Sequence, residues 1–285
     1  MSENRLIRIG NQTAFSAATP AQPFEYAVAN GFDAFEWFPD KKPWGAGWDE
    51  SHLDGGTRRS IRDTAVARGI RLSVHARWQA NPLTPEAWSA LLKDVELAED
   101  LGASLLNIHL YTEMGLDAYV KAILPLVKRT SSAGLQLSIE NTPLTTPEHF
   151  NELFTRLRAN RSLRVNHVGM CFDLGHANLC AITRNDYLKY FDDLHPEVPI
   201  IHLHLHENRG DFDSHLTLFT GPAGRDASGV GEFLARIRRR NYSGSIILEQ
   251  WPHPPSLLNQ AHAGLKQMLS EEQTTTPVRP GKPVA

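Results

Sequence analysis

The chain alternates short apolar runs with longer stretches of helical periodicity, and this alternation is the feature that most constrains its fold. The runs are rich in branched aliphatic residues and predict strands at Leu6–Gly10, Ala34–Trp37, Arg71–His75, Leu105–His109, Leu135–Glu140, Val168–Asp173, Ile200–His204 and Ser245–Glu249. Strands that alternate with helices predict a parallel sheet. Repeats of this size in 285 residues close most naturally as a single α/β barrel of the (β/α)8 type, which needs about 250 residues.

Proline and glycine mark the expected helix ends. Three threonine–proline pairs place a capping hydroxyl before a proline suited to the first helical turn: Thr19-Pro20, Thr84-Pro85 and Thr146-Pro147. Four glycines stand a few residues before a predicted strand, where a left-handed helix end favours glycine: Gly31, Gly69, Gly102 and Gly134. We therefore expect one barrel domain over residues 1–270, and a disordered tail over 271–285, which lacks apolar periodicity.

Charge and apolar content argue against several classes of protein. The 29 basic and 32 acidic residues give a net charge of −3, so no general attraction to nucleic acid or anionic membrane is expected. The N-terminus is charged where a secretory signal is apolar, and no run approaches the roughly 18 apolar residues of a membrane span. Cys171 and Cys180 are too few for a disulfide framework. We expect a cytoplasmic protein with two free thiols, with homo-oligomerisation left open.

The stretch Ile200–His215, IIHLHLHENRGDFDSH, concentrates donor atoms around the end of a predicted strand. Alternation along the strand places His202, His204 and His206 on one face, and Asp213 and His215 follow shortly after. A single histidine is more often a hydrogen-bonded core residue than a metal ligand. Imidazole nitrogen together with carboxylate oxygen, however, is a ligand set typical of zinc, manganese or iron.

Donor-bearing residues also close the other predicted strands. From the third strand onward these residues are His75, His109, Glu140, Asp173, His204 and Glu249. An isolated charge is costly to bury, so a shared metal ion is the economical explanation. His176 lies three residues after Asp173 and can face the same cavity. We therefore expect a metal site at the C-terminal ends of the strands.

The order and spacing of these motifs resemble the xylose isomerase-like, endonuclease IV-like TIM barrel superfamily of metal-dependent sugar isomerases, epimerases and abasic-site nucleases. The resemblance extends to about Leu269. Its isomerase and epimerase branch implies one divalent ion (Mn, Mg, Co or Zn) held by Glu140, Asp173, His204 and Glu249. It also implies that His176 lies close to the substrate. Glu140 and Glu249 would move a proton at the carbon next to a metal-bound carbonyl.

The nuclease branch of the same superfamily implies three zinc ions. This chain has a residue of matching type at each further ligand position, namely His75, His109, His176, Asp213 and His215. Such a cluster hydrolyses phosphodiesters by activating water. The loops after the predicted strands nevertheless offer few basic side chains for phosphate contacts, which favours a small sugar, sugar phosphate or polyol over nucleic acid. A barrel that binds metal and a small ligand without catalysis is a third alternative.

Two long loops, 38–56 and 207–228, are expected to form walls or lids around the site. The aromatic rings of Trp37, Trp44 and Trp48 either stack on a sugar or pack the first loop down. The remaining candidates for substrate contacts are His75, His109, Glu36 and Arg209. Glu36 can instead form a structural ion pair with a neighbouring arginine, and Arg209 is implied by the resemblance to ketose epimerases despite a different spacing. His202 and His206 are expected to support the site or to pack. The glycines of GPAG, 221–224, are a weaker indication of a phosphate contact.

Overall fold

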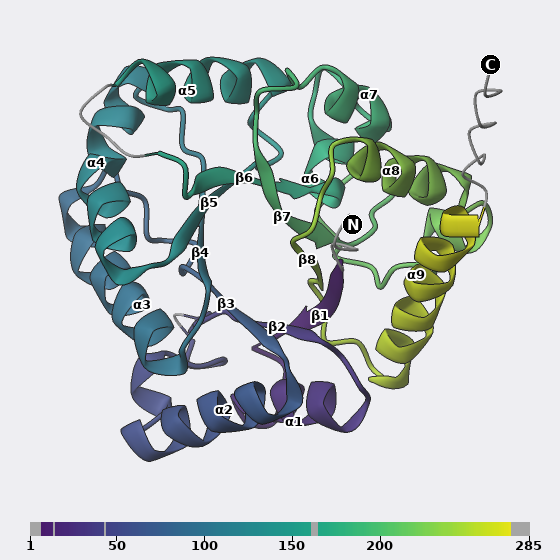
Figure 1. Cartoon of the computed structure of the whole chain (residues 1–285), viewed down its shortest axis with the longest axis horizontal. Helices are drawn as coiled ribbons and strands as arrows, with labels where there is room; N and C mark the ends of the chain where they lie inside the picture. The colour runs from purple at the N-terminus through teal and green to yellow at the C-terminus, as the bar shows by residue number, and fades with distance from the viewer. Residues whose placement is uncertain (1–6, 14, 43, 161–164, 275–285) are drawn as a thin grey trace, which may run out of the picture.

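The computed structural model describes residues 7–13, 15–42, 44–160 and 165–274, and these form a barrel of parallel strands surrounded by helices (Figure 1). Each strand pairs with the next along the chain, and β8 pairs back with β1, so the sheet is closed. The predicted (β/α)8 TIM barrel is therefore confirmed.

The strands are β1 Arg8–Gln12, β2 Ala34–Trp37, β3 Arg71–His75, β4 Leu105–His109, β5 Gln136–Glu140, β6 Val168–Asp173, β7 Ile200–Leu205 and β8 Ser245–Leu248. Four of them, β2, β3, β4 and β6, have the predicted bounds, and three others differ by one residue at one end. The first strand lies two residues later than predicted, because Asn11 and Gln12 pair in register with Phe35 and Glu36 of β2. The two polar residues are buried strand residues, which apolar patterning does not reveal.

The helices are α1 Gln22–Ala29, α2 Gly55–Arg68, α3 Trp88–Leu101, α4 Leu116–Ala133, α5 Pro147–Ala159, α6 Leu174–Leu179, α7 Tyr187–Asp192, α8 Ser228–Arg239 and α9 Ser256–Thr274. Three 3-10 turns, η1 Glu50–His52, η2 Pro85–Ala87 and η3 Pro222–Gly224, lie in the loops. Helix α9 includes residues 271–274 of the predicted tail, and the remainder of that tail lies outside the described residues. Among the described residues, no helix combines the length and apolar character needed to cross a membrane.

The structure confirms most of the predicted helix ends. Thr146 caps α5 through its hydroxyl, and Gly69, Gly102 and Gly134 end their helices with φ of 65°, 67° and 71°. Thr84-Pro85 begins the 3-10 turn that precedes α3. The pair Thr19-Pro20 does not begin α1, which starts at Gln22, although the Thr19 hydroxyl accepts a hydrogen bond from the Gln22 amide.

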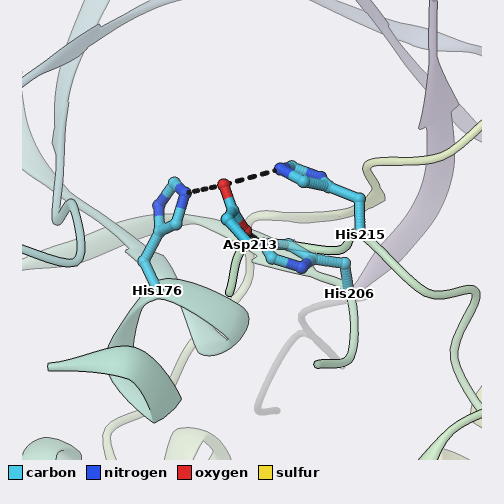
Figure 2. Close-up of side chains that lie close together, drawn as sticks. All are labelled: His176, His206, Asp213 and His215. Carbon is cyan, nitrogen blue, oxygen red and sulfur yellow. Dashed lines mark hydrogen bonds and ion pairs between the residues drawn. The ribbon is translucent and has the colours of Figure 1, made fainter. Parts of the chain in front are cut away.

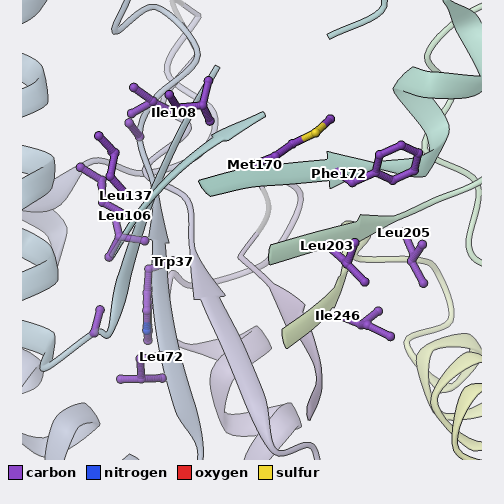
Figure 3. Close-up of a cluster of buried hydrophobic side chains, with 14 of the residues drawn as sticks. Trp37, Leu72, Leu106, Ile108, Leu137, Met170, Phe172, Leu203, Leu205 and Ile246 are labelled. Carbon is purple, nitrogen blue, oxygen red and sulfur yellow. The ribbon is translucent and has the colours of Figure 1, made fainter. Parts of the chain in front are cut away.

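The strands divide apolar from polar side chains between the two faces of the sheet. Leu203, Leu205 and Ile246 point toward the surrounding helices (Figure 3) and are fully buried there. The alternate positions of β7 carry His202 and His204 into the barrel, and Glu249 follows directly after β8. The apolar core therefore lies between sheet and helices, and the barrel interior is left for polar chemistry. Cys171 and Cys180 are both buried and free, as expected.

Candidate metal centre

The imidazoles of β7 reach the barrel interior because alternation puts them opposite the outward-facing leucines. His204 pairs in register with Asp173, the last residue of β6. On the other side, Leu205 pairs with Leu248 of β8, so His206 and Glu249 follow at the same level. Three neighbouring strands thus deliver a carboxylate, an imidazole and a carboxylate to one end of the barrel.

The central cluster consists of His75, Glu140, His204 and Glu249, whose ligand atoms all lie within 4.8 Å of one another. His204 Nδ1 is 3.0 Å from Glu249 Oε1 and 3.3 Å from Glu140 Oε2. His75 Nε2 is 3.0 Å from Glu140 Oε2, and His109 Nε2 is 3.6 Å from Glu140 Oε1. Glu140 is therefore shared by donors from β3, β4 and β7.

The outer cluster consists of His176, His206, Asp213 and His215 (Figure 2). Asp213 Oδ2 lies 3.2 Å from His176 Nε2 and 3.1 Å from His215 Nε2. His206 Nε2 is 3.7 Å from Asp213 Oδ1, and the rings of His206 and His215 stack with centroids 3.9 Å apart. The long loop after β7 thus folds back so that its aspartate bridges two imidazoles.

Asp173 links the two clusters. Its Oδ1 lies 3.2 Å from His206 Nε2, and its Oδ2 lies 3.6 Å from His176 Nδ1. A ligand atom of Asp173 lies within 4.8 Å of ligand atoms of Glu140 and His176. The same is true of Asp173 with His206 and Glu249. The structure therefore gathers the residues that the sequence suggested as metal ligands into these groups, except His109, which lies 3.6 Å from Glu140 Oε1, and it adds His206.

Several buried polar atoms at this junction have no hydrogen-bond partner. Those that face the clusters include Glu140 Oε1, Asp173 Oδ2, Glu249 Oε2, His204 Nδ1 and His206 Nε2. A buried polar atom without a partner costs about 1–3 kcal/mol. Carboxylate oxygens and imidazole nitrogens left open toward one another suit a divalent cation, which would satisfy them together. The residues present therefore fit a bound metal ion.

In the absence of a metal ion, attraction between the carboxylates and the imidazoles of the cluster decides which of these groups are charged. Burial raises the pKa of Glu140, but the charges of His204, His109 and His75 lower it by more, so that its pKa lies well below the usual range. The pKa of Glu249 is lowered in the same way, chiefly by His204. Burial lowers the pKa of His204, but the surrounding acidic groups raise it well above the ordinary value. The carboxylates are thus ionised, and a metal ion would replace imidazole protons.

Glu36 lies beneath the central cluster and does not contact the substrate cavity. It is fully buried, and its Oε2 accepts hydrogen bonds from His202 Nε2 at 2.8 Å and from Ser73 Oγ at 2.8 Å. Its Oε1 is 2.8 Å from His204 Nε2, an ion-pair contact whose direction falls outside hydrogen-bond geometry. The predicted substrate contact is therefore wrong. Glu36 instead forms the structural ion pair that the sequence offered as the alternative, with His202 and His204 in place of an arginine.

Trp37 is likewise not a substrate residue. It follows Glu36 on β2, so its ring points outward (Figure 3), and it is fully buried. The ring packs against Phe24, Phe35 and Trp48, with centroids 5.0–5.8 Å apart. Trp48 therefore packs the first loop down, as one of the two interpretations predicted. Trp44 is 73% exposed.

Arg209 lines a different cavity from the metal centre. That cavity has a volume of 790 Å³ and lies between the loop after β7 and helices α6 and α7. The spacing from the β7 histidines did not reveal that Arg209 turns away, because the path of the loop decides its direction. The GPAG segment is also accounted for: the Glu207 carboxylate accepts hydrogen bonds from the amides of Phe219, Gly221 and Ala223, and so fills the place of an anion.

The metal centre opens into a cavity of 670 Å³, here called the mouth. Its polar lining includes Gln12 and Gln250 together with His75, His109, Glu140, His176, Asp213, His215 and Glu249. His75, His109 and His176, predicted to contact substrate, therefore do face the substrate-sized space. The sequence analysis named His206 among the donors on the face of His204 but expected it to support the site or to pack, whereas the structure places it among the ligand atoms of the outer cluster.

Comparisons with known proteins agree with this architecture. A family model described as xylose isomerase-like TIM barrel matches residues 24–269. Uncharacterized protein MJ1311 of Methanocaldococcus jannaschii is 26% identical over 146 residues, which cover 49% of this chain and 45% of that protein. The matched part thus spans about half the length of this curated relative.

Solved structures show the same fold. A D-tagatose 3-epimerase-like protein superimposes with a TM-score of 0.71 at 21% identity, covering 94% of this chain and 100% of that one. An L-ribulose 3-epimerase has a TM-score of 0.68 at 16% identity, with 96% of this chain and 100% of that one covered. At these identities the likeness establishes the barrel fold, and the function must be argued from the site.

Proposed function

This chain belongs to the xylose isomerase-like TIM barrel family, and from that premise we propose that it is a divalent-metal-dependent isomerase or epimerase of a small sugar or polyol. The observation that carries the proposal is the central cluster, in which the carboxylates of Glu140 and Glu249 approach the same imidazole from β5 and β8. The structural likeness to proteins named as sugar 3-epimerases supports the same class of reaction.

In this mechanism the two carboxylates move the proton. A divalent ion bound at the central cluster would polarise the substrate carbonyl and so acidify the neighbouring C–H. Because the pKa values of Glu140 and Glu249 lie well below the usual range, both side chains are ionised and able to accept that proton. One carboxylate removes it and passes it on to solvent, and in an epimerase the other, after taking up a proton from solvent, delivers that proton to the opposite face. His176, which lines the mouth beside Glu140, is placed to hold a substrate oxygen.

The charges around the mouth favour a substrate without phosphate. Among the described residues that line the mouth, Lys42 is the only lysine or arginine. Its Nζ is already 2.7 Å from Asp40 Oδ2. A phosphate group is normally held by free basic side chains or by backbone amides. We therefore favour a neutral sugar or polyol over a sugar phosphate.

A phosphodiesterase is the second candidate, and the outer cluster is the observation that favours it. Asp213 and His215 complete a further set of ligands around His176, and a one-metal epimerase does not require them. Several metal ions held close together would stabilise the charge that develops on a phosphodiester oxygen during hydrolysis.

The test begins with the metal content of the purified protein. We expect one Mn, Mg, Co or Zn ion per chain for the sugar enzyme, and two or three Zn ions for the phosphodiesterase. The metal-loaded protein is then incubated with a panel of ketoses in D2O and, separately, with an abasic DNA duplex. Exchange of a substrate C–H with deuterium, without duplex cleavage, is the expected result. Cleavage without exchange would overturn the proposal.

Variants of the two carboxylates test the mechanism itself. Glu140→Gln and Glu249→Gln should each slow deuterium exchange by about 10²- to 10⁴-fold, the usual contribution of general acid–base catalysis. Glu86→Gln is the matched control, because Glu86 is exposed in the turn before α3. Near-normal exchange in either carboxylate variant would show that the proton is moved by another group.

A further inference from the structure

Large apolar side chains are exposed on the segments that follow seven successive strands of the barrel. These side chains are Phe15, Trp44, Trp78, Met114, Leu144, Ile182 and Phe212. Elsewhere in the described part of the chain, the large apolar side chains of comparable exposure are Val66 and Leu92, on α2 and α3. Exposed apolar side chains thus recur in the loops after the strands, and those that line a common cavity are the candidates for a binding surface.

Two of these side chains line the mouth. Phe15 and Trp78 are 47% and 49% exposed, and the mouth wall also contains Phe38, Leu216, Trp251 and Pro252. Contacts hold the two exposed residues in place: the Lys42 ammonium lies 5.1 Å from the centroid of the Phe15 ring, and the Trp78 carbonyl accepts a hydrogen bond from the Tyr111 hydroxyl. The mouth therefore combines a polar floor with an apolar wall.

The size and charge of the mouth restrict what can occupy that wall. A volume of 670 Å³ falls in the range of roughly 300–1,000 Å³ that encloses drug-sized ligands. A free monosaccharide would occupy the polar floor and leave much of the apolar wall in water. A polyanion such as nucleic acid is disfavoured, because Lys42 is paired with Asp40 and the carboxylates of Asp213 and Glu249 face the same space.

We infer that the substrate is a glycoside that carries a ketone on its sugar ring, because the acetal carbon of a glycoside offers no carbonyl to the proposed reaction. The sugar with its ketone enters the metal centre, and the neutral apolar group of the glycoside, such as an aromatic ring, packs against Phe15 and Trp78. The sugar part of this inference rests on the proposed function, whereas the apolar subsite rests on the wall itself. Aromatic rings suit this task because they offer a large rigid apolar surface at a small entropic cost.

The subsite is tested with 2-naphthol, a neutral aromatic probe, on the metal-loaded full-length protein. Binding is measured by titration calorimetry for the wild type and for Phe15→Ala and Trp78→Ala. We expect each substitution to weaken naphthol binding at least tenfold. Trp44→Ala is the matched control, because Trp44 is 73% exposed and is not among the residues that line the mouth. Its affinity should stay within twofold of the wild type.

Absence of naphthol binding to the wild type, or equal losses in Trp44→Ala and Trp78→Ala, would overturn the subsite. Circular dichroism checks that each variant is folded, and Trp78→Leu replaces Trp78→Ala if the latter is not. The glycoside is tested with the 3-keto derivatives of the 2-naphthyl glycosides of glucose, galactose and xylose, which carry the ring ketone that the proposed reaction needs. At least one should bind tenfold more tightly than 2-naphthol, and the inference is wrong if none does.

The two proposals fail in distinguishable ways. Deuterium exchange with free ketoses, combined with no naphthol binding, would remove the glycoside inference and keep the isomerase or epimerase. Naphthol and naphthyl glycoside binding that depends on Phe15 and Trp78, combined with no exchange on any sugar or glycoside, would remove the proposed reaction and keep the subsite.

Discussion

Replacing Glu36 by Gln should weaken metal binding without touching a metal ligand. Glu36 lies 2.8 Å from His204 Nε2, while the other ring nitrogen of His204 faces the central cluster. A carboxylate behind a metal-binding imidazole fixes the ring orientation and raises its basicity. Burial raises the pKa of Glu36, but the charges of His204 and His202 lower it by more, so the carboxylate is ionised and able to do this. An amide at position 36 would keep the size and lose the charge.

The expected loss follows from the number of ligands affected. Glu36 contacts His204, which is one of the four side chains of the central cluster. Removing such a partner of a metal-binding imidazole typically lowers the metal affinity 10–100-fold. That range corresponds to about 1.4–2.7 kcal/mol. A bound metal ion stabilises the folded state by RT ln(1 + M/Kd), where M is the free ion concentration. With the ion in excess, the same change should therefore lower the stability of the metal-loaded protein by a similar amount.

The assay is a titration of chelator-stripped protein with ZnCl2 or MnCl2 against a competing chromophoric chelator. Glu86→Gln, an exposed change of the same chemistry, should bind the ion as the wild type does. Near-ultraviolet circular dichroism establishes that the Glu36 variant has kept its packed core. A folded Glu36→Gln protein with an affinity within twofold of the wild type would refute the reasoning, because the charge beneath His204 would then be irrelevant to the ion.

Three further predictions concern the outer cluster. Gly175→Ala should reduce metal binding, because the added Cβ would lie 2.1 Å from a carbon of the His206 ring. Gly231→Ala is the control in the same titration, because a Cβ added at Gly231 meets no atom within 4 Å. For a sugar enzyme, the double change of Asp213 and His215 to Asn should leave one ion per chain, measured by mass spectrometry. It should also leave at least a tenth of the activity, which corresponds to a loss of at most about 1.4 kcal/mol of transition-state stabilisation. Loss of one metal ion and of most of the activity would instead indicate the phosphodiesterase. Although burial alone lowers the pKa of His215, Asp213 and Glu249 raise it to about 9, so His215 is protonated at pH 7.5. Metal binding at this imidazole should therefore release a proton at pH 7.5 and progressively less as the pH rises through 9, which calorimetry in buffers of different ionisation enthalpy would detect.

The sequence alone determined the barrel and most of its donor residues. Apolar runs alternating with helical stretches leave few arrangements other than a parallel sheet closed by helices, and strands such as Arg71–His75 could be bounded to the residue. Donors at successive strand ends also predicted that Glu140, Asp173 and Glu249 would meet, because the ends of parallel strands lie at the same end of a barrel. These inferences needed only local patterns and the direction of the strands.

Tertiary structure decided which face of each strand and which side of each loop the side chains occupy. Both faces of a barrel strand are buried, so alternation separates Glu36 from Trp37 without saying which of them points inward. The role of His206 depends on the register of β7 against β6 and β8, which closure of the whole sheet fixes. Arg209 turns to another cavity because the loop after β7 folds back on Glu207. Spacing along the chain constrains neighbours in sequence, whereas these placements arise from contacts between segments that only the closed barrel brings together.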